Sequence, residues 1–387
     1  MIDLINNNEK APKSLGLYIH IPFCRTKCLY CDFCSFVSRN ENERKEYVGA
    51  LLKEIEARTT KEYLVDTIYF GGGTPSILSA EQIERILSCI QENFVVCDDV
   101  EITLECNPMT HLDDGKEYFS ALRLMGINRL SIGIQSAVDE ELKLIGRRHS
   151  FAEAKNTFFD ARESGFDNIS IDLMFGIPSQ TIESLNYSLN EFIKLGADHI
   201  SIYSLQLEEE TPLYKMQHKY NLADDDTVAD MYELVVSLMK RAGYFHYEIS
   251  NFAKYGRESR HNSKYWRVDE YLGLGLSAHS DFSGKRVENT HDMNKYILGE
   301  YIENQVEISC GERELEFLML GLRMDRGISK AEFFARFGID FDEKYGEKIE
   351  KYVKMGYFLK NGDTVALSEN GFEVSNMILA EFLDFDY

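Results

Sequence analysis

From residue 15 to about residue 210, short β-branched apolar runs alternate with longer stretches that have helical periodicity. Strands are expected at 17–21, 67–70, 101–105, 129–134, 168–174 and 199–205. Helices are expected between them, at 41–58, 80–94, 115–125, 151–164 and 181–195. Parallel strands require crossover connections, and helices of this length supply them. The pattern therefore predicts an α/β domain with a six-stranded parallel sheet, either open and doubly wound or curled into a closed or partial barrel.

The alternation stops near residue 210, which suggests four segments: a short tail at 1–14, the α/β domain at 15–210, an α+β connecting region at 211–310 and a C-terminal domain at 311–387. The last segment is expected to contain three helices, a hairpin turning at Asn361-Gly362 and a final helix, an order that resembles a winged helix. It carries 10 Lys and Arg against 16 Asp and Glu. Because DNA binding needs clustered positive charge, this balance favours a packing or protein-contact module.

Composition narrows the function classes. The 387 residues are 44% hydrophobic and 28% charged, which is typical of a globular chain of two or three domains. A net charge of −23 would repel a phosphate backbone, so nucleic acid is not an expected partner. No apolar run approaches the roughly 20 residues of a membrane-spanning helix, and no secretory signal is visible at the N-terminus. Four of the eight cysteines lie within residues 24–34, which indicates a metal site in a reducing cytoplasm rather than a disulfide framework.

The most specific motif is a C-x3-C-x2-C run formed by Cys24, Cys28 and Cys31, directly after the first expected strand. A 4Fe–4S cluster normally takes four cysteine ligands, so a loop with three thiolates leaves one iron open for another ligand. A structural zinc site needs four ligands, usually from two separated pairs, and the sequence offers no second pair. Cys31 and Cys34 also form a C-x2-C pair, which keeps a redox dithiol as an alternative. The spacing favours an iron–sulfur loop.

The cysteine loop and its flanks, from Tyr18 to Phe33, resemble the cluster loop of the radical S-adenosylmethionine (SAM) superfamily. This resemblance implies a partial (β/α)6 barrel of the TIM type, with SAM chelated to the open iron. The glycine run at 71–73 resembles the strip that binds the amino group of SAM, and polar strand ends match SAM-contacting positions of the coproporphyrinogen-oxidase-like branch. The SAM-binding residues implied by the resemblance are Tyr18, Tyr30, Gly72, Gly73, Thr74, Glu105, Gln135, Arg147 and Asp172.

A second motif, His261-Asn262-Ser263-Lys264-Tyr265-Trp266, contains the only tryptophan of the chain. In a helix, residues 261 and 265 would share one face and residues 262 and 266 another. Histidine is a common haem ligand, whereas the alternative is a helix start whose aromatic side chains pack into the core. The H-N-x-x-Y-W pattern resembles the signature of HemW-type haem chaperones, relatives of the oxygen-independent coproporphyrinogen III dehydrogenase. The haem-binding residues implied by this resemblance are His261, Asn262, Tyr265 and Trp266.

Three features favour the haem chaperones over the dehydrogenase. The dehydrogenase has a further cysteine two positions after its third ligand, where this chain has Phe33. It also has a substantial N-terminal segment, whereas 23 residues precede Cys24 here, and the haem-chaperone motif is intact. A fourth thiolate on the cluster would compete with SAM, so Cys34 is not expected to be a ligand. Its role stays open between a near-miss ligand, a protective thiol and an incidental residue.

The resemblance implies a cytoplasmic haem chaperone with a 4Fe–4S cluster, SAM and haem as bound groups and with no assigned catalytic residue. Its expected partners are haem and apo-haemoproteins, including membrane-bound respiratory enzymes, and the chain itself is not expected to be an integral membrane protein. The resemblance leaves open whether the chain forms a homodimer. One alternative is an enzyme that oxidatively decarboxylates coproporphyrinogen III with a SAM-derived radical. Another is an acidic interaction protein built on a relic barrel.

Overall fold

The computed structural model describes residues 13–38, 40–108, 110–111 and 114–382. A 12-stranded sheet organises most of this part of the chain, and seven neighbouring strands in it run parallel. In spatial order these are β11 (Tyr271–Leu274), β1 (Lys13–Ile21), β4 (Tyr63–Gly72), β5 (Val95–Cys106), β6 (Arg129–Gln135), β7 (Ile169–Phe175) and β8 (His199–Ser204). The six predicted strands are therefore confirmed, and β11 is an addition from the expected connecting region.

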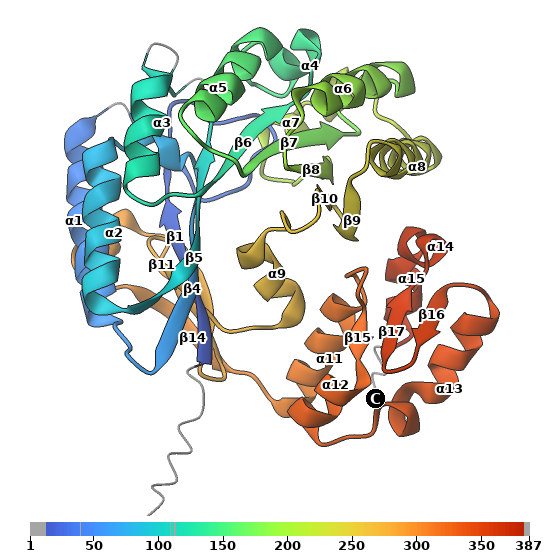
Figure 1. The fold of residues 1–387 in the computed structure, drawn as a ribbon. Helices are drawn as coiled ribbons and strands as arrows, with labels where there is room; N and C mark the ends of the chain where they lie inside the picture. Colours follow the sequence, from blue (N-terminus) through green and yellow to red (C-terminus); the bar gives the residue numbers. More distant parts are fainter. Residues whose placement is uncertain (1–12, 39, 109, 112–113, 383–387) are drawn as a thin grey trace, which may run out of the picture.

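Antiparallel strands extend both edges, so the sheet does not close on itself. Next to β11 lie β12 (His279–Phe282), β13 (Lys285–Asn289) and β14 (Ile302–Glu307), and next to β8 lie β10 (Asn251–Ala253) and β9 (Phe245–Glu248). Figure 1 shows the sheet curving around helix α9 (Arg260–Arg267), with the outer helices on its convex side. Of the arrangements that the sequence left open, the structure is a curled, incomplete barrel.

Helices cover the convex face of the sheet. The five predicted ones are α1 (Glu41–Ala57), α2 (Ala80–Asn93), α3 (Gly115–Leu124), α5 (Phe151–Glu163) and α6 (Ile182–Leu195), all within one or two residues of their expected limits. The starts of α2, α5 and α6 are fixed by capping boxes. In each box the side chain of the residue before the helix accepts a hydrogen bond from the backbone N–H of the third helical residue, whose own side chain accepts one from the backbone N–H of the residue before the helix. The sequence pattern did not predict one long helix, α8 (Asp225–Arg241). It also did not predict several short elements: the helices α4 (Asp139–Leu144), α7 (Pro212–Lys215) and α10 (Met293–Ile297), and the 3-10 turns η1 (Pro75–Ile77) and η2 (Gln217–Lys219).

The parallel strands have one apolar face and one polar face. In β6, Leu130 and Ile132 belong to the main hydrophobic core beneath the helices, whereas Arg129 and Ser131 face a cavity inside the curved sheet. Successive side chains of a strand point to opposite sides, so this alternation continues along each strand. Because the polar side chains gather on the concave face, the inside of the partial barrel is suited to a polar ligand.

Glu54 of α1 ties the outer layer to the strands beyond β11. Its buried carboxylate accepts hydrogen bonds from the backbone N–H of Gly275 at 2.8 Å, the hydroxyl of Tyr296 at 2.7 Å and the amide of Asn289 at 2.7 Å. It also forms an ion pair with Arg58 at 3.3 Å. Burial raises the pKa of Glu54, so these partners are what offset the cost of its charge.

The C-terminal part has its own hydrophobic core and a three-stranded antiparallel sheet. Its elements are α11 (Cys310–Gly321), β15 (Ile328–Ser329), α12 (Lys330–Phe337), α13 (Phe341–Lys354), β16 (Phe358–Asn361), β17 (Thr364–Leu367), α14 (Glu369–Glu373) and α15 (Ser375–Ala380). The predicted order of helices and hairpin is present. The turn is at Gly362-Asp363 rather than Asn361-Gly362, because Asn361 pairs with Thr364. The winged-helix assignment and the four segment boundaries stay predictions.

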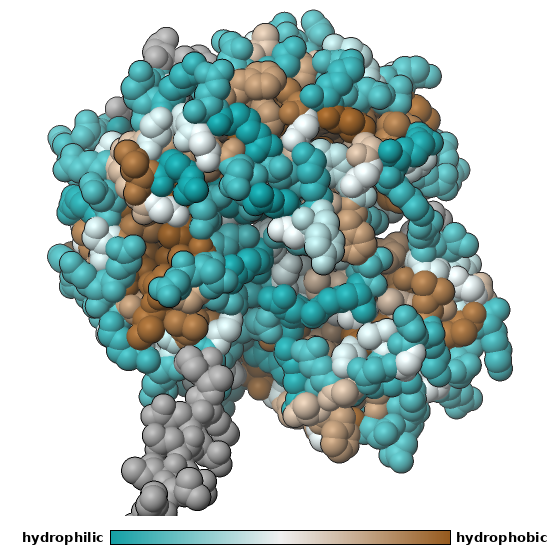
Figure 2. All heavy atoms as spheres, in the orientation of Figure 1, coloured by the Kyte–Doolittle hydropathy of each residue, from teal (hydrophilic) through white to brown (hydrophobic). Residues whose placement is uncertain are grey.

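The face of the molecule in Figure 2 is largely hydrophilic, and hydrophobic side chains gather in a few separate areas. This distribution agrees with a net charge of −23. Within the part of the chain that the structure describes, none of the helices combines the length and apolarity needed to cross a bilayer.

Candidate functional site

The cysteine loop is held in place by backbone hydrogen bonds at both ends. It begins with β2 (Phe23–Cys24) and returns at β3 (Phe36–Val37), and these two short strands pair in parallel. In its middle, the N–H of Leu29 donates to the carbonyl of Ile145 at 3.0 Å, and the N–H of Leu213 donates to the carbonyl of Leu29 at 2.9 Å. The loop is therefore fixed across the carboxyl ends of the parallel strands, where such folds place their sites.

The three thiols of the motif differ in burial. Cys24 is buried and accepts a hydrogen bond from the hydroxyl of Thr74 at 3.5 Å, while Cys28 and Cys31 line a cavity. Burial raises the pKa of Cys31 to about 11 and also raises the pKa of Cys24. Cys24 and Cys31 would therefore be protonated as free thiols at neutral pH, so their binding to iron must displace protons. Three thiols on one fixed loop, two of them facing a cavity, fit the ligand set of an iron–sulfur cluster.

Among the described residues, no three Cys, His, Asp or Glu side chains converge on a point as the ligands of a single metal ion would. A 4Fe–4S cube is bound differently, because each thiolate ligates a different iron.

The glycine run after β4 lies directly against the cysteine loop. The N–H of Gly73 donates to the carbonyl of Ile21 at 2.9 Å, and the N–H of Thr74 donates to the carbonyl of Phe23 at 2.8 Å. Gly72 has a φ of +108°, and a Cβ on it would lie 2.5 Å from the ring of His20. A Cβ on Gly73 would lie 2.8 Å from the carbonyl oxygen of Phe23. Glycine is therefore required at both positions, for conformation at Gly72 and for close approach at each.

These elements surround a cavity of about 400 Å³, here named the carboxyl-end cavity because it opens at the carboxyl ends of the parallel strands. This volume is within the usual range of small-molecule sites, about 300–1,000 Å³. The structure brings eleven of the predicted site residues to its wall: Cys28, Cys31, Tyr30, Gly72, Gly73, Thr74, Glu105, Gln135, Arg147, Asp172 and Asn262.

Two carboxyl groups in this cavity are buried. Glu105 accepts hydrogen bonds from the hydroxyl of Tyr69 at 2.7 Å and from the N–H of Gly72 at 3.2 Å. Asp172 accepts one from the hydroxyl of Ser131 at 3.2 Å. Burial raises the pKa of Glu105 to about 7 and also raises the pKa of Asp172. Carboxyl groups held in this way can accept hydrogen bonds from the hydroxyl or amino groups of a ligand.

Arg147 supplies a positive charge near the cysteine loop. One of its terminal nitrogens donates to the hydroxyl of Tyr30 at 3.2 Å, while its buried Nε has no partner among the described residues. A guanidinium in this position can bind a carboxylate through two parallel hydrogen bonds.

Five predicted site residues do not line the carboxyl-end cavity: Tyr18, Cys24, His261, Tyr265 and Trp266. The hydroxyl of Tyr18 lies 3.2 Å from Nδ1 of His20, whose other ring nitrogen contacts the carbonyl of Cys34 at 3.0 Å.

His261 is completely buried, and both of its ring nitrogens are occupied. Nδ1 lies 2.9 Å from the hydroxyl of Thr67 on β4, and Nε2 lies 2.8 Å from the hydroxyl of Tyr265. Burial, followed by the charges of Lys264 and Arg129, lowers the pKa of His261 to about 3. In this conformation the imidazole is neutral and has no nitrogen free for iron. The predicted alternative, a helix start packed into the core, describes the position of His261 here.

The first turn of α9 forms a wall between two hollows. Asn262 faces the carboxyl-end cavity, whereas Arg260 and Ser263 line a second hollow of about 560 Å³. We name this second hollow the amino-end cleft, because Asn128 and Asn168 line it just before strands β6 and β7 begin.

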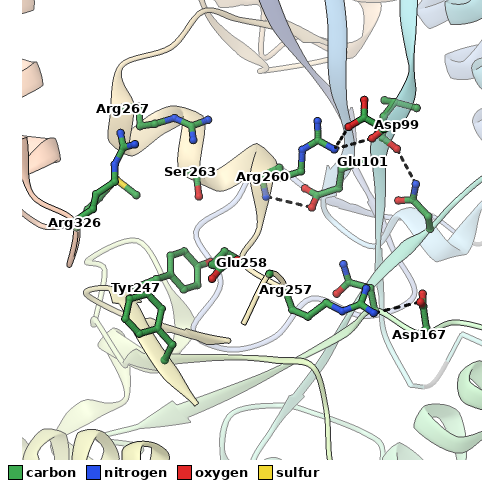
Figure 3. A pocket seen from close by; sticks show the side chains of 16 residues that line it. Asp99, Glu101, Asp167, Tyr247, Arg257, Glu258, Arg260, Ser263, Arg267 and Arg326 are labelled. Carbon is green, nitrogen blue, oxygen red and sulfur yellow. Dashed lines mark hydrogen bonds and ion pairs between the residues drawn. The ribbon is translucent and has the colours of Figure 1, made fainter. Parts of the chain in front are cut away.

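The amino-end cleft lies between the partial barrel and the C-terminal part, which contributes Arg326. In Figure 3, Arg260 lies beside Asp99 and Arg257 beside Asp167, with closest ion-pair distances of 3.4 and 3.3 Å. The four arginines on its wall are matched by four acidic residues, so it carries no strong excess of positive charge.

Several residues of the carboxyl-end cavity were not predicted. They include Arg129 and Ser131 of β6, and Ser201 and Tyr203 of β8. Polar residues at alternate positions of otherwise apolar strands could have identified them, but the sequence-based prediction used mainly the polar residues at strand ends.

Comparison with known proteins agrees with this geometry. Residues 18–192 match the model of the radical SAM superfamily, and residues 311–374 match that of the HemN C-terminal domain. The chain is 37% identical to the haem chaperone HemW of Bacillus subtilis, over 95% of this chain and 98% of that protein. It is 34% identical to the haem chaperone HemW of Escherichia coli, over 95% and 98% of the two chains.

Among solved structures, coproporphyrinogen III oxidase (HemN) of Escherichia coli superposes with a TM-score of 0.83. The match covers 97% of this chain and 92% of that one at 23% identity, and it shows a shared fold. The chain therefore belongs to the HemW family of the radical SAM superfamily.

Proposed function

We propose that this protein is a haem chaperone, which binds haem and passes it to apo-haemoproteins. The observation that carries the proposal is the similarity to curated haem chaperones, which extends over 95% of this chain and so includes the segment of α9. We further propose that the protein acts in the cytoplasm and that respiratory enzymes are among its recipients.

We propose that Cys24, Cys28 and Cys31 hold a 4Fe–4S cluster and that SAM occupies the carboxyl-end cavity. When bound, the cluster would chelate SAM at its open iron and could supply an electron to the sulfonium. The chain's own residues would bind and orient SAM. Arg147 would donate hydrogen bonds to its carboxylate, and Glu105 and Asp172 would accept hydrogen bonds from its amino and ribose groups. Gln135 and the glycine run complete this wall.

We propose that haem binds at α9, with Asn262, Tyr265 and Trp266 shaping the site. His261 could ligate iron only after its contacts with Thr67 and Tyr265 are released. Two neutral hydrogen bonds of this kind contribute about 1 kcal/mol each, a cost that the formation of an iron–imidazole bond would offset. Haem loading would then be accompanied by a rearrangement of α9.

The test is an anaerobic reconstitution of the cluster followed by two measurements on the same preparation. Haem binding is followed by absorbance, and transfer is followed by incubating the loaded protein with an apo-haemoprotein and measuring haem in the separated recipient. Turnover of coproporphyrinogen III with SAM and reductant is measured in parallel. Cys28→Ser tests the cluster, and Cys310→Ser is its matched control because Cys310 is exposed at the start of α11.

Stoichiometric haem binding with transfer to the recipient and no coproporphyrinogen turnover would support the proposal. Robust formation of protoporphyrinogen would instead assign the chain to the dehydrogenase reaction. If the protein showed neither haem binding nor turnover, both assignments would fail and an interaction role would be favoured.

A further inference from the structure

Arg129 is one of the largest fully buried side chains of the protein, with 1% of its surface exposed. It lies on the concave face of β6 and lines the carboxyl-end cavity. Gln135 at the carboxyl end of β6 is six residues further along, which corresponds to about 20 Å at roughly 3.3 Å per residue. Arg129 therefore lies deeper in the partial barrel than Gln135, two residues before Ser131, which is the register partner of Glu105.

The charge of this guanidinium acts on the buried carboxyl groups of Glu105 and Asp172 and opposes the rise in their pKa, but Arg129 makes no hydrogen bond with them. Among the described residues none accepts a hydrogen bond from Arg129, and its Nε is both buried and unpaired. Its register partner on the neighbouring strand is Thr103, whose fully buried hydroxyl is unpaired as well. A buried cation without a hydrogen-bonded partner is destabilising, and native proteins rarely keep one unless it has a functional role. Arg129 on the cavity wall and Thr103 beside it on β5 both lack hydrogen-bond partners, which an anionic ligand could supply.

The ligand class follows from the chemistry of the cavity. A planar guanidinium binds a carboxylate or a phosphate best, and the hydroxyl of Thr103 adds a further donor. Arg147 beside the cysteine loop is proposed to bind the carboxylate of SAM, which leaves Arg129 available to hydrogen-bond a different carboxylate. Arg129 also contributes to lowering the pKa of His261, after burial and Lys264, so its charge acts next to the helix at which haem is proposed to bind. Haem carries two propionates, which supply carboxylates of this kind.

We propose that Arg129, assisted by Thr103, is the anchor for one propionate of the haem that binds beside α9. This inference rests on the proposed function, because it assigns a residue to the haem site. It distinguishes two arginines at different depths of one barrel: Arg147 for the carboxylate of SAM and Arg129 for the carboxylate of the tetrapyrrole.

The experiment compares iron protoporphyrin IX with its dimethyl ester, which has no free carboxylate, on the cluster-reconstituted protein. The natural protein should bind the free acid at least tenfold more tightly, equivalent to about 1.4 kcal/mol. Arg129→Met should bind the two within threefold of each other, and Arg129→Lys should keep part of the preference. Arg85→Met, which alters an exposed arginine on α2, should retain all of it.

Two further measurements separate anchoring from other roles. Without ligands, Arg129→Met should unfold at a urea concentration no lower than that of the natural protein, because a buried charge without a hydrogen-bond partner has been removed. A markedly lower urea midpoint would show that Arg129 forms a structural ion pair and would overturn the proposal. SAM affinity should stay within threefold, and a tenfold loss would assign Arg129 to SAM instead. If the natural protein binds both porphyrins equally, or if Arg129→Met keeps the preference, this inference alone fails. If the natural protein binds neither, the proposed function fails with it.

Discussion

Replacing His261 with leucine tests whether this imidazole is a packed, neutral part of the core. Nδ1 and Nε2 each share a hydrogen bond with a hydroxyl, from Thr67 at 2.9 Å and from Tyr265 at 2.8 Å. Leucine fills much of the volume but leaves both hydroxyls without a partner. Each hydroxyl that loses its partner in the protein interior costs about 1–3 kcal/mol, so His261→Leu should lower the free energy of unfolding by about 2–6 kcal/mol.

The same residue predicts how stability depends on pH. Burial lowers the pKa of His261 to about 3, whereas an unfolded histidine titrates near 6.5. Between these values the unfolded chain binds the extra proton, so acid favours unfolding. The contribution of the neutral His261 to the free energy of unfolding is therefore fully present above pH 6.5 and is lost as the pH falls towards 3. Its upper limit is about 5 kcal/mol, at about 1.4 kcal/mol per pH unit. His261→Leu should flatten the stability profile in this window.

The assay is urea unfolding of the ligand-free protein at several pH values between 4.5 and 8, followed by tyrosine and tryptophan fluorescence. His279→Ala is the control, because His279 is exposed and its loss should change stability by no more than about 0.5 kcal/mol. If His261→Leu were as stable as the natural protein and kept the same pH profile, the imidazole would be solvated and the reasoning refuted.

Three other substitutions test the site and its support. Cys28→Ser should abolish the iron and sulfide retained after reconstitution. Cys34→Ser should retain them, because a fourth thiolate on the cluster would compete with SAM, and equal loss in both would make Cys34 a ligand. Gly72→Ala should lower the free energy of unfolding by about 2–4 kcal/mol, since its φ is +108° and the new Cβ would meet the ring of His20, and an unchanged thermal midpoint would contradict the geometry. Glu54→Ala should cost about 3–5 kcal/mol in urea unfolding, because its salt-bridge partner loses its counter-charge, and a loss below 1 kcal/mol would show that the ion pair is solvated.

The main sheet could be predicted from the sequence because its signals are local. The capping residues and helical periodicity place the five helices to within one residue, and the β-branched runs locate the six strands, three of which begin four to six residues earlier than predicted. The four-residue strand β11 could not be found in this way, since it is too short to show a period. Its pairing with β1 is set by tertiary contacts across more than 250 residues of sequence.

The candidate site was predictable where motif and strand end coincide, as at Cys28, Gly72 and Glu105. It was missed where the information lies in the register between strands, as at Arg129 and Thr103. The position of His261 could not be derived either, because helical periodicity places it on a face without saying what that face packs against. Only the contacts with β4 and Tyr265 show that the imidazole is enclosed.

The position of α9 as a shared wall has a thermodynamic consequence. Asn262 on one side and Ser263 on the other belong to the same turn, so a shift of this turn changes the shape of both hollows at once. Any ligand that prefers one orientation of α9 must alter the affinity of the opposite hollow, and reciprocity requires the same factor in both directions. Ligand binding in the carboxyl-end cavity would then change the ligand affinity of the amino-end cleft, next to the C-terminal part. This change would be an allosteric signal that the protein is loaded.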